Sequence, residues 1–594
     1  SGKKLKERLT EHQAQAELSK RLATIACDAP VAFTPEAYAI SPNGQRMAQF
    51  CQRYELKSVQ KGFSKLYPPT AAPLALGTTE AFSPDVTILC EEEEAEAFAK
   101  KARAGKRLAF VGRYEGHPPH VKMMGAGVCA GKESAYAAAD SKAWPILWEL
   151  LHDDAVECDT VSLKRFYHAG GRPARHFFDA ALAAYLLDPE AGEVSVADLR
   201  DAWGADVAPC PLGLTAEALA AWQAAAIFSL RDALQAQLKA QGLEKLYAKM
   251  ELPLAEVLAG MEAAGIYVNR GHLKEQGEAI RHTIAQLEDE IFSLAQHAFN
   301  LNSPKQMGVV LFEELGLPPL QKTKKQGGYS TNVEVLSSLR SEHPIVEKIL
   351  AYRMWTKLQA TYIDAIDDLI DAQTQRVHTR FNQMATVTGR LSSSEPNLQN
   401  IPVRTEEGRA IRRLFEPGEG YAYLVSADYS QIELRLLAHL AGDERMIEAF
   451  LHEEDIHART ASEVFGVPLS EVTPELRRHA KAVNFGIVYG ISDFGLAKNI
   501  GISRKEAATY IAQYFARYPK VKQFLDRTVE KAHESGSVTT MFGRRRALPA
   551  IHSPNFHQRS LAERMAMNTP IQGTAADLIK IAMVRAYDAL QAAD

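Results

Sequence analysis

The alternation of apolar and polar positions predicts a block of short strands followed by a long helical region. Residues 82–245 alternate apolar runs typical of strands, such as DVTILC and KRLAFV, with stretches of helical spacing. From about residue 246 the apolar positions recur mainly at helical spacing, beginning with ELPLAEVLAGMEAAGIYVN. Residues 421–427 (YAYLVSA) are apolar and rich in strand-forming residues, and we expect them to form a buried strand that ends at Asp428.

The helix expected over residues 473–489 (TPELRRHAKAVNFGIVY) carries an unusual stripe of side chains. Its first residue is a threonine, a good N-cap, and a proline follows where the missing N–H is not needed. Arg477, Lys481, Phe485 and Tyr489 recur every four residues and therefore lie along one face. Two cations followed by two aromatic rings fit a ligand with a polyphosphate at one end and a flat base and sugar at the other. The alternative is a surface helix with this spacing by chance.

The composition is that of an ordinary globular protein. A chain of 594 residues has room for roughly three or four domains, and 46% hydrophobic and 24% charged residues are typical values. Because the net charge is −5, any surface for nucleic acid must be a local basic lining. The six cysteines form no Cys-x-x-Cys pair, so we expect reduced thiols in a cytoplasmic protein. No apolar run approaches about 18 residues, and no signal peptide is present, so we expect neither membrane insertion nor export.

Four longer motifs contain or accompany these positions. In chain order they read TGRLSSSEPNLQNIPVR from Thr388, DYSQIELR from Asp428, RRHAKAVNFGIVYG from Arg477 and ERMAMNTPIQGTAAD from Glu563. In this order and separation they closely resemble the motifs of family A DNA polymerases, and the resemblance covers nearly the whole chain. It implies an α/β multidomain fold, in which a vestigial 3′–5′ exonuclease-like α/β domain precedes a right-hand polymerase with palm, thumb and fingers.

The resemblance also implies a division of the chain. Residues 1–81 would be a remnant of the 5′-nuclease region and a linker, residues 82–245 the exonuclease-like domain, and residues 246–594 the polymerase domain. Within the polymerase domain, the thumb would cover about 266–380, the palm about 386–435 and 555–594, and the fingers about 440–552.

The candidate catalytic residues come from two of the motifs. A carboxylate such as Asp428 suits Mg²⁺, which prefers hard oxygen ligands and keeps positions open for phosphates. The resemblance implies two Mg²⁺ ions, with Mn²⁺ as a substitute, held by Asp428 and the backbone carbonyl of Tyr429. Arg477 and Lys481 would hold the β- and γ-phosphates and would act with Asp428 in catalysis.

The other side chains that the resemblance assigns to the nucleotide have separate tasks. Glu433 would exclude a ribose 2′-hydroxyl, Phe485 would stack near the sugar, and Tyr489 would border the nascent base pair. His457 would add a hydrogen-bond donor; the alternatives are a structural histidine and, for Glu433, an ordinary solvent-facing charge. The nucleotide-binding set is Tyr429, Gln431, Ile432, Glu433, His457, Arg477, Lys481, Phe485 and Tyr489.

A second stripe of donors is expected to hold the DNA duplex. Arg564, Asn568 and Gln572 repeat every four residues on a predicted helix, and every base pair presents a minor-groove acceptor at nearly the same place. The alternative for this stripe is an ordinary polar helix face, and the alternative for the basic loop named below is an ordinary solvated loop. The resemblance adds Arg390, Asn397, Gln399, Asn400 and Arg404 as primer–template contacts, and Lys322, Lys324 and Lys325 in a basic loop at the tip of the thumb.

The exonuclease-like region lacks the chemistry of its relatives. That fold needs four carboxylates that hold two metal ions around the scissile phosphate. At the matching positions this sequence has Val111, Gly112 and Arg113, then Lys164, Arg165 and Phe166, and finally Trp222 and Ala226. Glu115 lies close to the first group, and Asp179 matches a family position that binds no metal. We therefore expect a structural domain without proofreading.

These features predict template-directed DNA synthesis in replication and repair, in which deoxynucleotides are added to a primer 3′-hydroxyl. The expected partners are primer–template DNA and deoxynucleoside triphosphates, and we expect a monomer in the cytoplasm, at the nucleoid. Two alternatives stay open. A single-subunit RNA polymerase would share the architecture, although Glu433 argues against it. A catalytically inactive DNA-binding scaffold would have little use for Arg477 and Lys481.

One feature of the family has no counterpart in the sequence. The resemblance implies a second carboxylate facing Asp428, from a His-Asp-Glu hairpin after the IQGTAAD helix, but here LIKIAMVRAYDALQ continues that helix. After Asp428 the nearest match is HEED at residues 452–455. We therefore expect a catalytically incomplete DNA-binding fragment, without the C-terminal palm segment, that exposes apolar surface, aggregates readily, binds DNA weakly and extends no primer. Otherwise Glu433 or Asp577 would have to take the second ion.

Overall fold

The structure is a computed structural model that describes residues 86–171, 176–203, 207–211, 213–319, 328–402 and 406–593. The described residues belong to a unit that spans Thr79–Asp594, and Ser1–Thr78 forms a separate unit. That separate unit lies outside the described residues, so the expected nuclease remnant and linker stay predictions.

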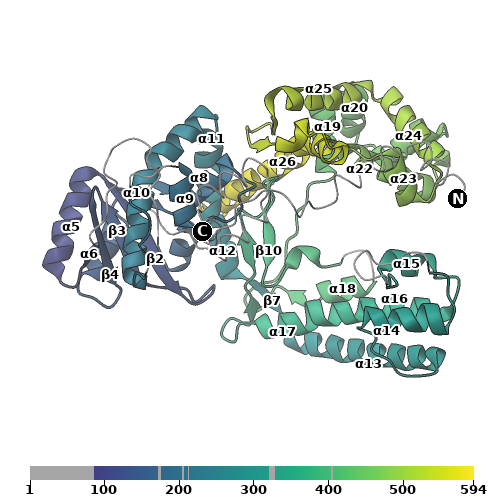
Figure 1. The fold of residues 1–594 in the computed structure, drawn as a ribbon, viewed down its shortest axis with the longest axis horizontal. Coiled ribbons are helices and arrows are strands. Elements are labelled where there is room, and N and C mark those ends of the chain that lie inside the picture. Colours follow the sequence, from purple (N-terminus) through teal and green to yellow (C-terminus); the bar gives the residue numbers. More distant parts are fainter. Residues whose placement is uncertain are drawn as a thin grey trace, which may run out of the picture. The chain divides into compact units, whose positions relative to one another are not determined.

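Residues 86–246, which we call the α/β domain, surround a six-stranded mixed sheet (Figure 1). The strands are β1 (Val86–Ile88), β2 (Arg107–Glu115), β3 (Lys122–Ala130), β4 (Glu133–Ala138), β5 (Glu157–Thr160) and β6 (Phe177–Asp179). Their spatial order is β1-β4-β3-β2-β5-β6; β3 is antiparallel to both of its neighbours, and the other pairs are parallel. The strands expected at DVTILC and KRLAFV are β1 and the start of β2.

Helices cover both faces of this sheet. Helices α5 (Glu92–Gly105), α6 (Trp144–Leu150) and α7 (Leu163–His168) pack on one face, and α8 (Ala180–Leu187), α9 (Val196–Trp203) and α10 (Ala216–Ala240) pack on the other; α11 (Glu244–Leu246) follows. Successive side chains of a strand point to opposite faces, so Leu108 and Phe110 of β2 enter one core while Ala109 and Val111 enter the other.

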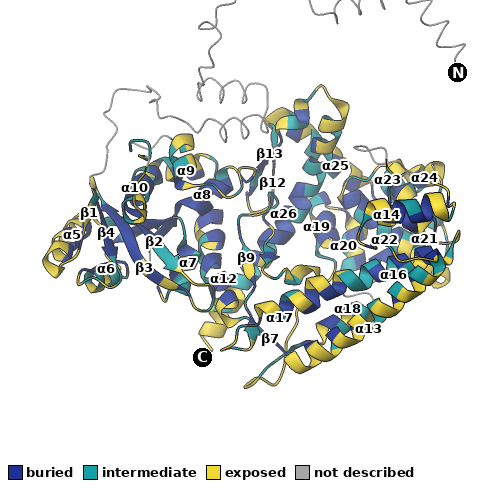
Figure 2. Cartoon of the chain, turned by 60° about the horizontal axis from the view of Figure 1, so that its bottom comes forward, coloured by how far each residue is buried: buried dark blue, intermediate teal, exposed yellow. Residues whose placement is uncertain are grey.

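The region from residue 247 to 369 is mainly helical, as its apolar spacing predicts. Its elements are η2 (Tyr247–Glu251), α12 (Leu252–Ala264), α13 (Arg270–Ala295), α14 (Pro304–Val309), η3 (Val310–Glu314), α15 (Val333–Ser338), α16 (Pro344–Leu358), η4 (Gln359–Asp364) and α17 (Ala365–Leu369). Helices α13 and α16 pack along each other over fully buried residues such as Ile291 and Ile349, and both expose their outer faces (Figure 2). The short strand β7 (Ile266–Val268) pairs with β8 (Arg376–Val377) and β11 (Phe415–Glu416).

The remaining chain contains a small hairpin and a second group of helices. The hairpin joins β9 (Arg380–Asn382) and β10 (Ser392–Ser394), and η5 (Leu398–Asn400) and α18 (Glu406–Arg412) follow. The later elements are α19 (Ile432–Ala441), α20 (Glu444–Leu451), α21 (Ile456–Phe465), η6 (Leu469–Glu471), α22 (Pro474–Val488), α23 (Asp493–Ile500), α24 (Arg504–Arg517), α25 (Pro519–Ser535), β12 (Ser537–Thr539), β13 (Arg545–Ala547), η7 (Pro549–His552) and α26 (Phe556–Gln591). Because α26 packs against α12, α19 and α25, it connects the second helical group to the start of the first (Figure 1).

The prediction of a buried strand over residues 421–427 is wrong. These residues form neither helix nor strand and all are exposed; Tyr423 and Val425 are 82% and 92% exposed. A strand needs a backbone partner, and no strand within the described ranges pairs with this segment. The apolar composition indicates a propensity to form a strand, but it does not show whether a second strand lies beside this segment to pair with it. Asp428 therefore lies on an exposed stretch.

Candidate active site

Helix α22 forms where the sequence predicts it. The hydroxyl of Thr473 accepts a hydrogen bond from the backbone N–H of Leu476 at 3.2 Å, and a proline occupies the first turn. The inner face of the helix buries Val483 and Ile487 in the core shared with α19 and α21. This burial fixes the orientation of the helix and leaves the predicted stripe on the opposite face.

The cationic half of the stripe is accessible. The Arg477 guanidinium donates to a carboxylate oxygen of Asp455 at 2.7 Å, and the two side chains are 46% and 42% exposed. The Lys481 ammonium lies 5.9 Å from the centre of the Phe485 ring. A half-exposed ion pair contributes about 0–1 kcal/mol to stability, so Arg477 can exchange Asp455 for an anionic ligand at low cost.

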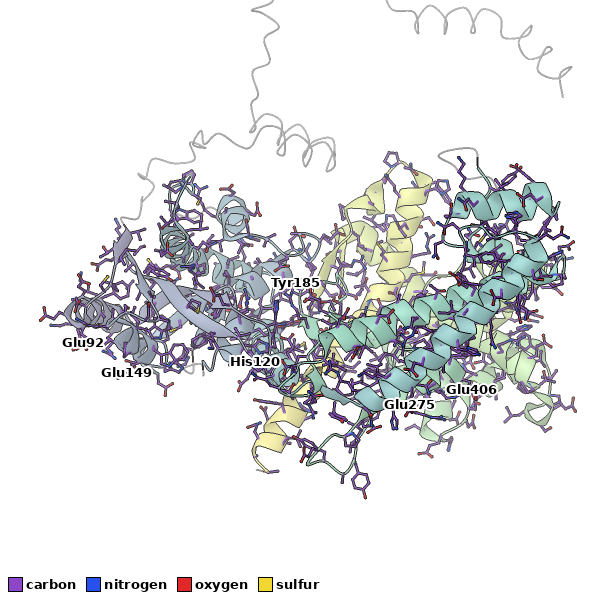
Figure 3. All side chains as sticks on the ribbon, turned by 90° about the horizontal axis from the view of Figure 1, so that it is seen from below. Glu92, His120, Glu149, Tyr185, Glu275 and Glu406 are labelled. Atoms are coloured by element: carbon purple, nitrogen blue, oxygen red, sulfur yellow. The ribbon has the colours of Figure 1, made fainter. Side chains whose placement is uncertain are left out.

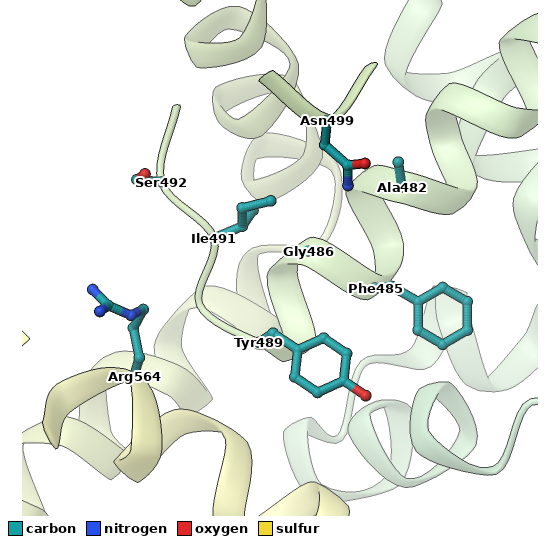
Figure 4. Close-up of a pocket in the computed structure, with 8 residues that line it drawn as sticks. All are labelled: Ala482, Phe485, Gly486, Tyr489, Ile491, Ser492, Asn499 and Arg564. Atoms are coloured by element: carbon teal, nitrogen blue, oxygen red, sulfur yellow. The ribbon is translucent and has the colours of Figure 1, made fainter. Parts of the chain in front are cut away.

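The aromatic half of the stripe lines a cavity of about 490 Å³ (Figure 4). Its lining residues are Ala482, Phe485, Gly486, Tyr489, Ile491, Ser492, Asn499 and Arg564. A side chain at Gly486 would place its Cβ 2.6 Å from the Ile491 side chain, so only glycine lets the chain after α22 pack this closely. The volume lies in the range of small-molecule sites.

His457 lies behind the stripe as a neutral, oriented imidazole. It is 3% exposed, its ring centre is 5.9 Å from that of Phe485, and the Asn484 amide lies 3.0 Å from its Nδ1. Burial lowers the pKa of His457 to about 4; Lys481 and Arg477 add to this effect, and Asp455 opposes it. If the Asn484 amide donates to Nδ1, the single proton of the neutral ring sits on Nε2.

Glu433 joins three segments that the sequence leaves far apart. Its carboxylate lies 2.5 Å from the Arg390 guanidinium and accepts a hydrogen bond from the Tyr489 hydroxyl at 3.2 Å. Glu433 is 8% exposed, so it is not an ordinary solvent-facing charge. Burial, followed by the charge of Glu433, raises the pKa of Tyr489. The structure thus brings three predicted site residues together.

The expected minor-groove stripe lies on α26, as predicted. Arg564 lines the cavity beside α22 and also donates to the Ser560 hydroxyl at 2.9 Å. The Asn568 amide donates to the backbone carbonyl of Val488 at 3.4 Å, and Gln572 lies within hydrogen-bonding reach of Tyr489. The stripe on α26 therefore faces the aromatic end of α22.

The other expected DNA contacts are partly used within the protein. Asn397 caps η5 by accepting from the Gln399 N–H at 3.0 Å, the Gln399 amide donates to the Leu391 carbonyl at 3.2 Å, and the Asn400 carbonyl accepts from Tyr362. The expected contacts Arg404, Lys322, Lys324 and Lys325 lie outside the described residues.

The residues around Asp428 offer oxygen ligands but no complete metal cage. Asp428 and Tyr429 are exposed, and Ile432 begins α19. Gln431, the N-cap, has φ +55°, a left-handed conformation uncommon for this residue type, and its buried side-chain oxygen lacks a hydrogen-bond partner among the described residues. The described ranges contain no group of three or more His, Cys, Asp or Glu residues that could hold a metal. The Asp428 carboxylate suits a hard cation, but most of the ligands of such an ion would have to come from outside the described side chains.

The two other acids considered as metal ligands are already occupied. Glu433 pairs with Arg390, as described above. Asp577 is buried, accepts from the Thr540 hydroxyl at 2.7 Å and pairs with Arg544 at 2.8 Å.

Asp577 belongs to a buried ionic network that sequence reasoning missed. Its other members are Glu251, Gln383, Arg544 and Lys580. The Lys580 ammonium lies 2.8 Å from Glu251, which also pairs with Arg544. Burial alone would raise the pKa of Glu251, but Lys580 and Arg544 lower it to about 2. Since these residues are up to 329 positions apart, no local pattern could have identified them.

The positions that the resemblance would assign to metal ligands in the α/β domain make packing and polar contacts within the protein. Arg113 pairs with Glu217, Phe166 and Trp222 are buried, and the Lys164 ammonium lies 2.6 Å from Glu262 of α12. Asp179 is buried as the N-cap of α8, accepting from Ala181 N at 2.9 Å and Leu182 N at 3.1 Å. Glu115 is exposed at the end of β2.

Comparison with known proteins identifies the family. The sequence profile of DNA polymerase family A matches residues 270–594. The chain is 42% identical to the DNA polymerase I of Bacillus caldotenax over 615 residues, and the match covers 98% of this chain and 67% of the relative. The chain therefore belongs to DNA polymerase family A.

Further relatives agree with this assignment. The DNA polymerase I of Geobacillus stearothermophilus is 44% identical over 98% of this chain and 67% of its own length. The thermostable DNA polymerase I of Thermus aquaticus is 53% identical over 58% of this chain and 42% of its own length. A solved structure, the POL domain of Pol1 from M. smegmatis in complex with DNA primer-template and dNTP, matches with a TM-score of 0.79 and 38% identity over 86% of this chain and 90% of that one.

Among the described residues, we find no helix with the length and apolar character needed to span a membrane.

Proposed function

We propose that this chain carries the site of a DNA-directed DNA polymerase, which adds deoxynucleotides to a primer 3′-hydroxyl as directed by a template strand. The observation that carries this proposal is the meeting of Arg390, Glu433 and Tyr489, from three separate motifs, at the aromatic end of a stripe that continues to Lys481 and Arg477. The M. smegmatis relative, whose structure contains primer-template and dNTP, supports it. Because the DNA of a bacterium lies in its cytoplasm, we place the protein at the nucleoid, as a monomer.

The hydrophobic cores support the proposed thumb but not a boundary between fingers and palm, because one core spans both. Residues 266–380 would form the thumb, residues 386–435 and 555–594 the palm, and residues 440–552 the fingers. Two cores lie mainly within the proposed thumb, around Ile291 and Ile366, and a separate core unites α19 to α25 with α26. Residues 82–245 would be the exonuclease-like domain.

The cationic end of α22 would bind the triphosphate. Arg477 would leave Asp455 for the β- and γ-phosphates, and Lys481, one turn further along, would neutralise the charge that develops there. His457 would donate its Nε2 proton as an uncharged group, because its depressed pKa keeps it neutral at pH 7. Phosphate binding would therefore depend on two permanent charges and one neutral donor.

The aromatic end would select the sugar and the base pair. Phe485 would stack near the sugar, and Tyr489 would border the nascent pair, with Gln431 and Ile432 lining the nucleotide below. Glu433, fixed by Arg390 and Tyr489, would leave no room for a 2′-hydroxyl. Because a correct pair is accepted by its shape, closure of α22 over it would be the selective step.

Asp428 and the carbonyl of Tyr429 would hold the metal. Bound there, Mg²⁺ would lower the pKa of the primer hydroxyl and stabilise charge on the phosphates, and Mn²⁺ would substitute. The donor set fits a hard cation, and the second of the two expected ions is also part of the proposal.

The remaining polar residues would follow the DNA. Arg564, Asn568 and Gln572 would test minor-groove acceptors without reading sequence. Arg390, Asn397, Gln399, Asn400 and Arg404, together with Lys322, Lys324 and Lys325, would contact primer and template along the backbone and groove.

One observation favours a second candidate function, DNA binding without catalysis. A two-metal site normally offers several ligating side chains close together, but the described residues contain no group of three or more His, Cys, Asp or Glu that could hold a metal. The two candidates differ in whether bound nucleotide is ever incorporated.

A primer-extension assay decides between them. The protein encoded by the complete gene is incubated with a labelled primer–template, deoxynucleotides and Mg²⁺, Mn²⁺ or a chelator. We expect metal-dependent extension that stops when Asp428 is changed to Asn, while the control Asp526→Asn, at a side chain that is 55% exposed on α25, extends normally. DNA binding with no extension under any metal would support the second candidate and contradict the first.

A further inference from the structure

The turn that carries Arg390 is held by a side chain of the α/β domain. The hydroxyl of Tyr185, on α8, donates to the backbone carbonyl of Thr386 at 2.7 Å. The Thr386 hydroxyl in turn donates to the backbone carbonyl of Arg390 at 2.6 Å. Tyr185 is 1% exposed and lies at the side of the α/β domain next to the elements after residue 246 (Figure 3). Two hydrogen bonds thus connect a helix without catalytic residues to Arg390.

The same turn also rests on the buried ionic network. Gly389 has φ +83°, and a Cβ at this position would lie 2.6 Å from Nε of Arg544. Arg544 is 2% exposed and is fixed by Glu251 and Asp577. The guanidinium therefore fills the space directly against Gly389, and Tyr185 holds the carbonyl of Thr386, so both contacts restrict the turn.

The chain leading into the turn is anchored as well. The Lys164 ammonium, on α7, donates to the Phe381 carbonyl at 2.7 Å, and the Gln383 amide donates to the Glu251 carbonyl at 2.7 Å. Lys164 occupies one of the positions where the exonuclease-like sequence lacks an expected carboxylate. The α/β domain therefore contacts this segment at two points, through Lys164 and Tyr185.

The turn ends in the pair that fixes Glu433. Arg390 is half exposed, whereas its partner Glu433 is buried, so the position of the Arg390 backbone controls how that guanidinium meets the carboxylate. We propose that Tyr185 is a positioning residue for sugar selection: through Thr386 it sets the place of Arg390 and hence of the Glu433 carboxylate. The inference rests on the proposed role of Glu433 against a 2′-hydroxyl. The α/β domain then serves the polymerase site as a support.

The test compares two tyrosine hydroxyls of the α/β domain in the complete protein. Tyr185→Phe removes the hydrogen bond to Thr386 and keeps the ring. The matched control, Tyr136→Phe, removes a buried hydroxyl that accepts from Arg113 at 3.3 Å, remote from the turn. The measured quantity is the ratio of kcat/KM for a deoxynucleotide to that for the matching ribonucleotide.

We expect Tyr185→Phe to lower this ratio about threefold to tenfold, mainly through better use of the ribonucleotide, because small displacements of a positioned group change rates steeply. The control should stay within about twofold of the parent ratio. Thr386→Val, which breaks the next link, should reproduce the effect and covers the case that Tyr185→Phe folds poorly. An unchanged ratio in properly folded Tyr185→Phe or Thr386→Val would overturn the inference. This holds even if the melting temperature of the variant is lower, because a change in stability alone indicates a purely structural role.

A double-mutant cycle separates this inference from the proposed role of Glu433. Glu433→Ala should lower the ratio by itself, and Tyr185→Phe should add nothing once the carboxylate is gone. If Glu433→Ala has no effect, the sugar-selecting role fails and the inference fails with it. If Glu433→Ala lowers the ratio but the effects of the two substitutions are independent, only the inference about Tyr185 is wrong.

Discussion

The α/β domain and the α22 site treat their polar residues in opposite ways. In the α/β domain, the positions that the resemblance would assign to metal ligands include Phe166, which is fully buried, and Lys164, which pairs with the buried Glu262. Along α22, Arg477 and Lys481 stay accessible and have at most weak partners. The difference is that Lys164 pairs with a buried carboxylate, whereas the pair of Arg477 stays open to solvent, where a ligand could replace Asp455.

The buried network around Glu251 joins η2 to α26 and should produce the largest change when it is broken. Glu251→Gln leaves Arg544 and Lys580 with an unpaired buried positive charge, and the expected cost is roughly 3–5 kcal/mol. Thermal unfolding should show a melting temperature lower by several degrees.

Glu444→Gln is the control for this substitution, because it breaks an exposed pair with Lys520 and should lower the melting temperature much less. Equal melting temperatures for the two variants would mean that the network does not stabilise the fold.

Removing one cation from each region should sharpen the comparison further. Lys481→Ala should lower kcat/KM for nucleotide incorporation by roughly 10²–10³-fold, since a group that stabilises developing charge is lost. Arg165→Ala, which removes a cation lying over the Tyr114 ring in the α/β domain, should leave kcat/KM within about twofold. Steady-state kinetics of single-nucleotide insertion measures both. Similar losses would contradict the contrast between the regions.

A smaller change is expected at the aromatic end of the stripe. Phe485→Tyr supplies a hydroxyl that can replace the one missing from a dideoxynucleotide. One hydrogen bond of about 1 kcal/mol or more should reduce the preference for deoxynucleotides over dideoxynucleotides on the order of tenfold. The ratio of incorporation efficiencies for deoxy- and dideoxynucleotides gives the result. A ratio that does not move would count against placing the sugar beside Phe485.

The pKa of His457 predicts a pH dependence of stability. Its folded-state pKa of about 4 lies below the unfolded value of about 6.5, so the unfolded state binds the proton first as the pH falls. Stability is therefore present above pH 6.5 and is lost progressively down to pH 4, by at most about 3 kcal/mol.

Melting temperatures between pH 4 and 7 should fall less steeply for His457→Gln than for the parent. Parallel curves would show that His457 is not responsible.

The last prediction is that the protein has no 3′–5′ exonuclease activity. Labelled single-stranded DNA incubated with the pure protein and Mg²⁺ or Mn²⁺ should keep its 3′ end, because none of the four expected carboxylates is present. Glu115→Gln should behave identically. Shortening that disappears in Glu115→Gln would identify this exposed acid as an overlooked metal ligand and remove the distinction between the two regions.

The sequence by itself determined the features that depend on near neighbours. The cap at Thr473, the proline after it and a four-residue repeat were enough to place α22 and to bring its stripe to one face, because helix geometry relates positions only a few residues apart. The stripe of Arg564, Asn568 and Gln572 on α26 and the first strands of the α/β domain followed from equally local patterns.

Only the tertiary structure decided which distant residues meet. The contact of Glu433 with Arg390 and Tyr489, the network from Glu251 to Lys580, and the hydrogen bond from Tyr185 to Thr386 span separations that no periodicity encodes. The exposed stretch at residues 421–427 shows the same limit, since its apolar composition was visible but its lack of a pairing strand was not. Burial of polar groups requires partners, and the folded chain alone supplies them.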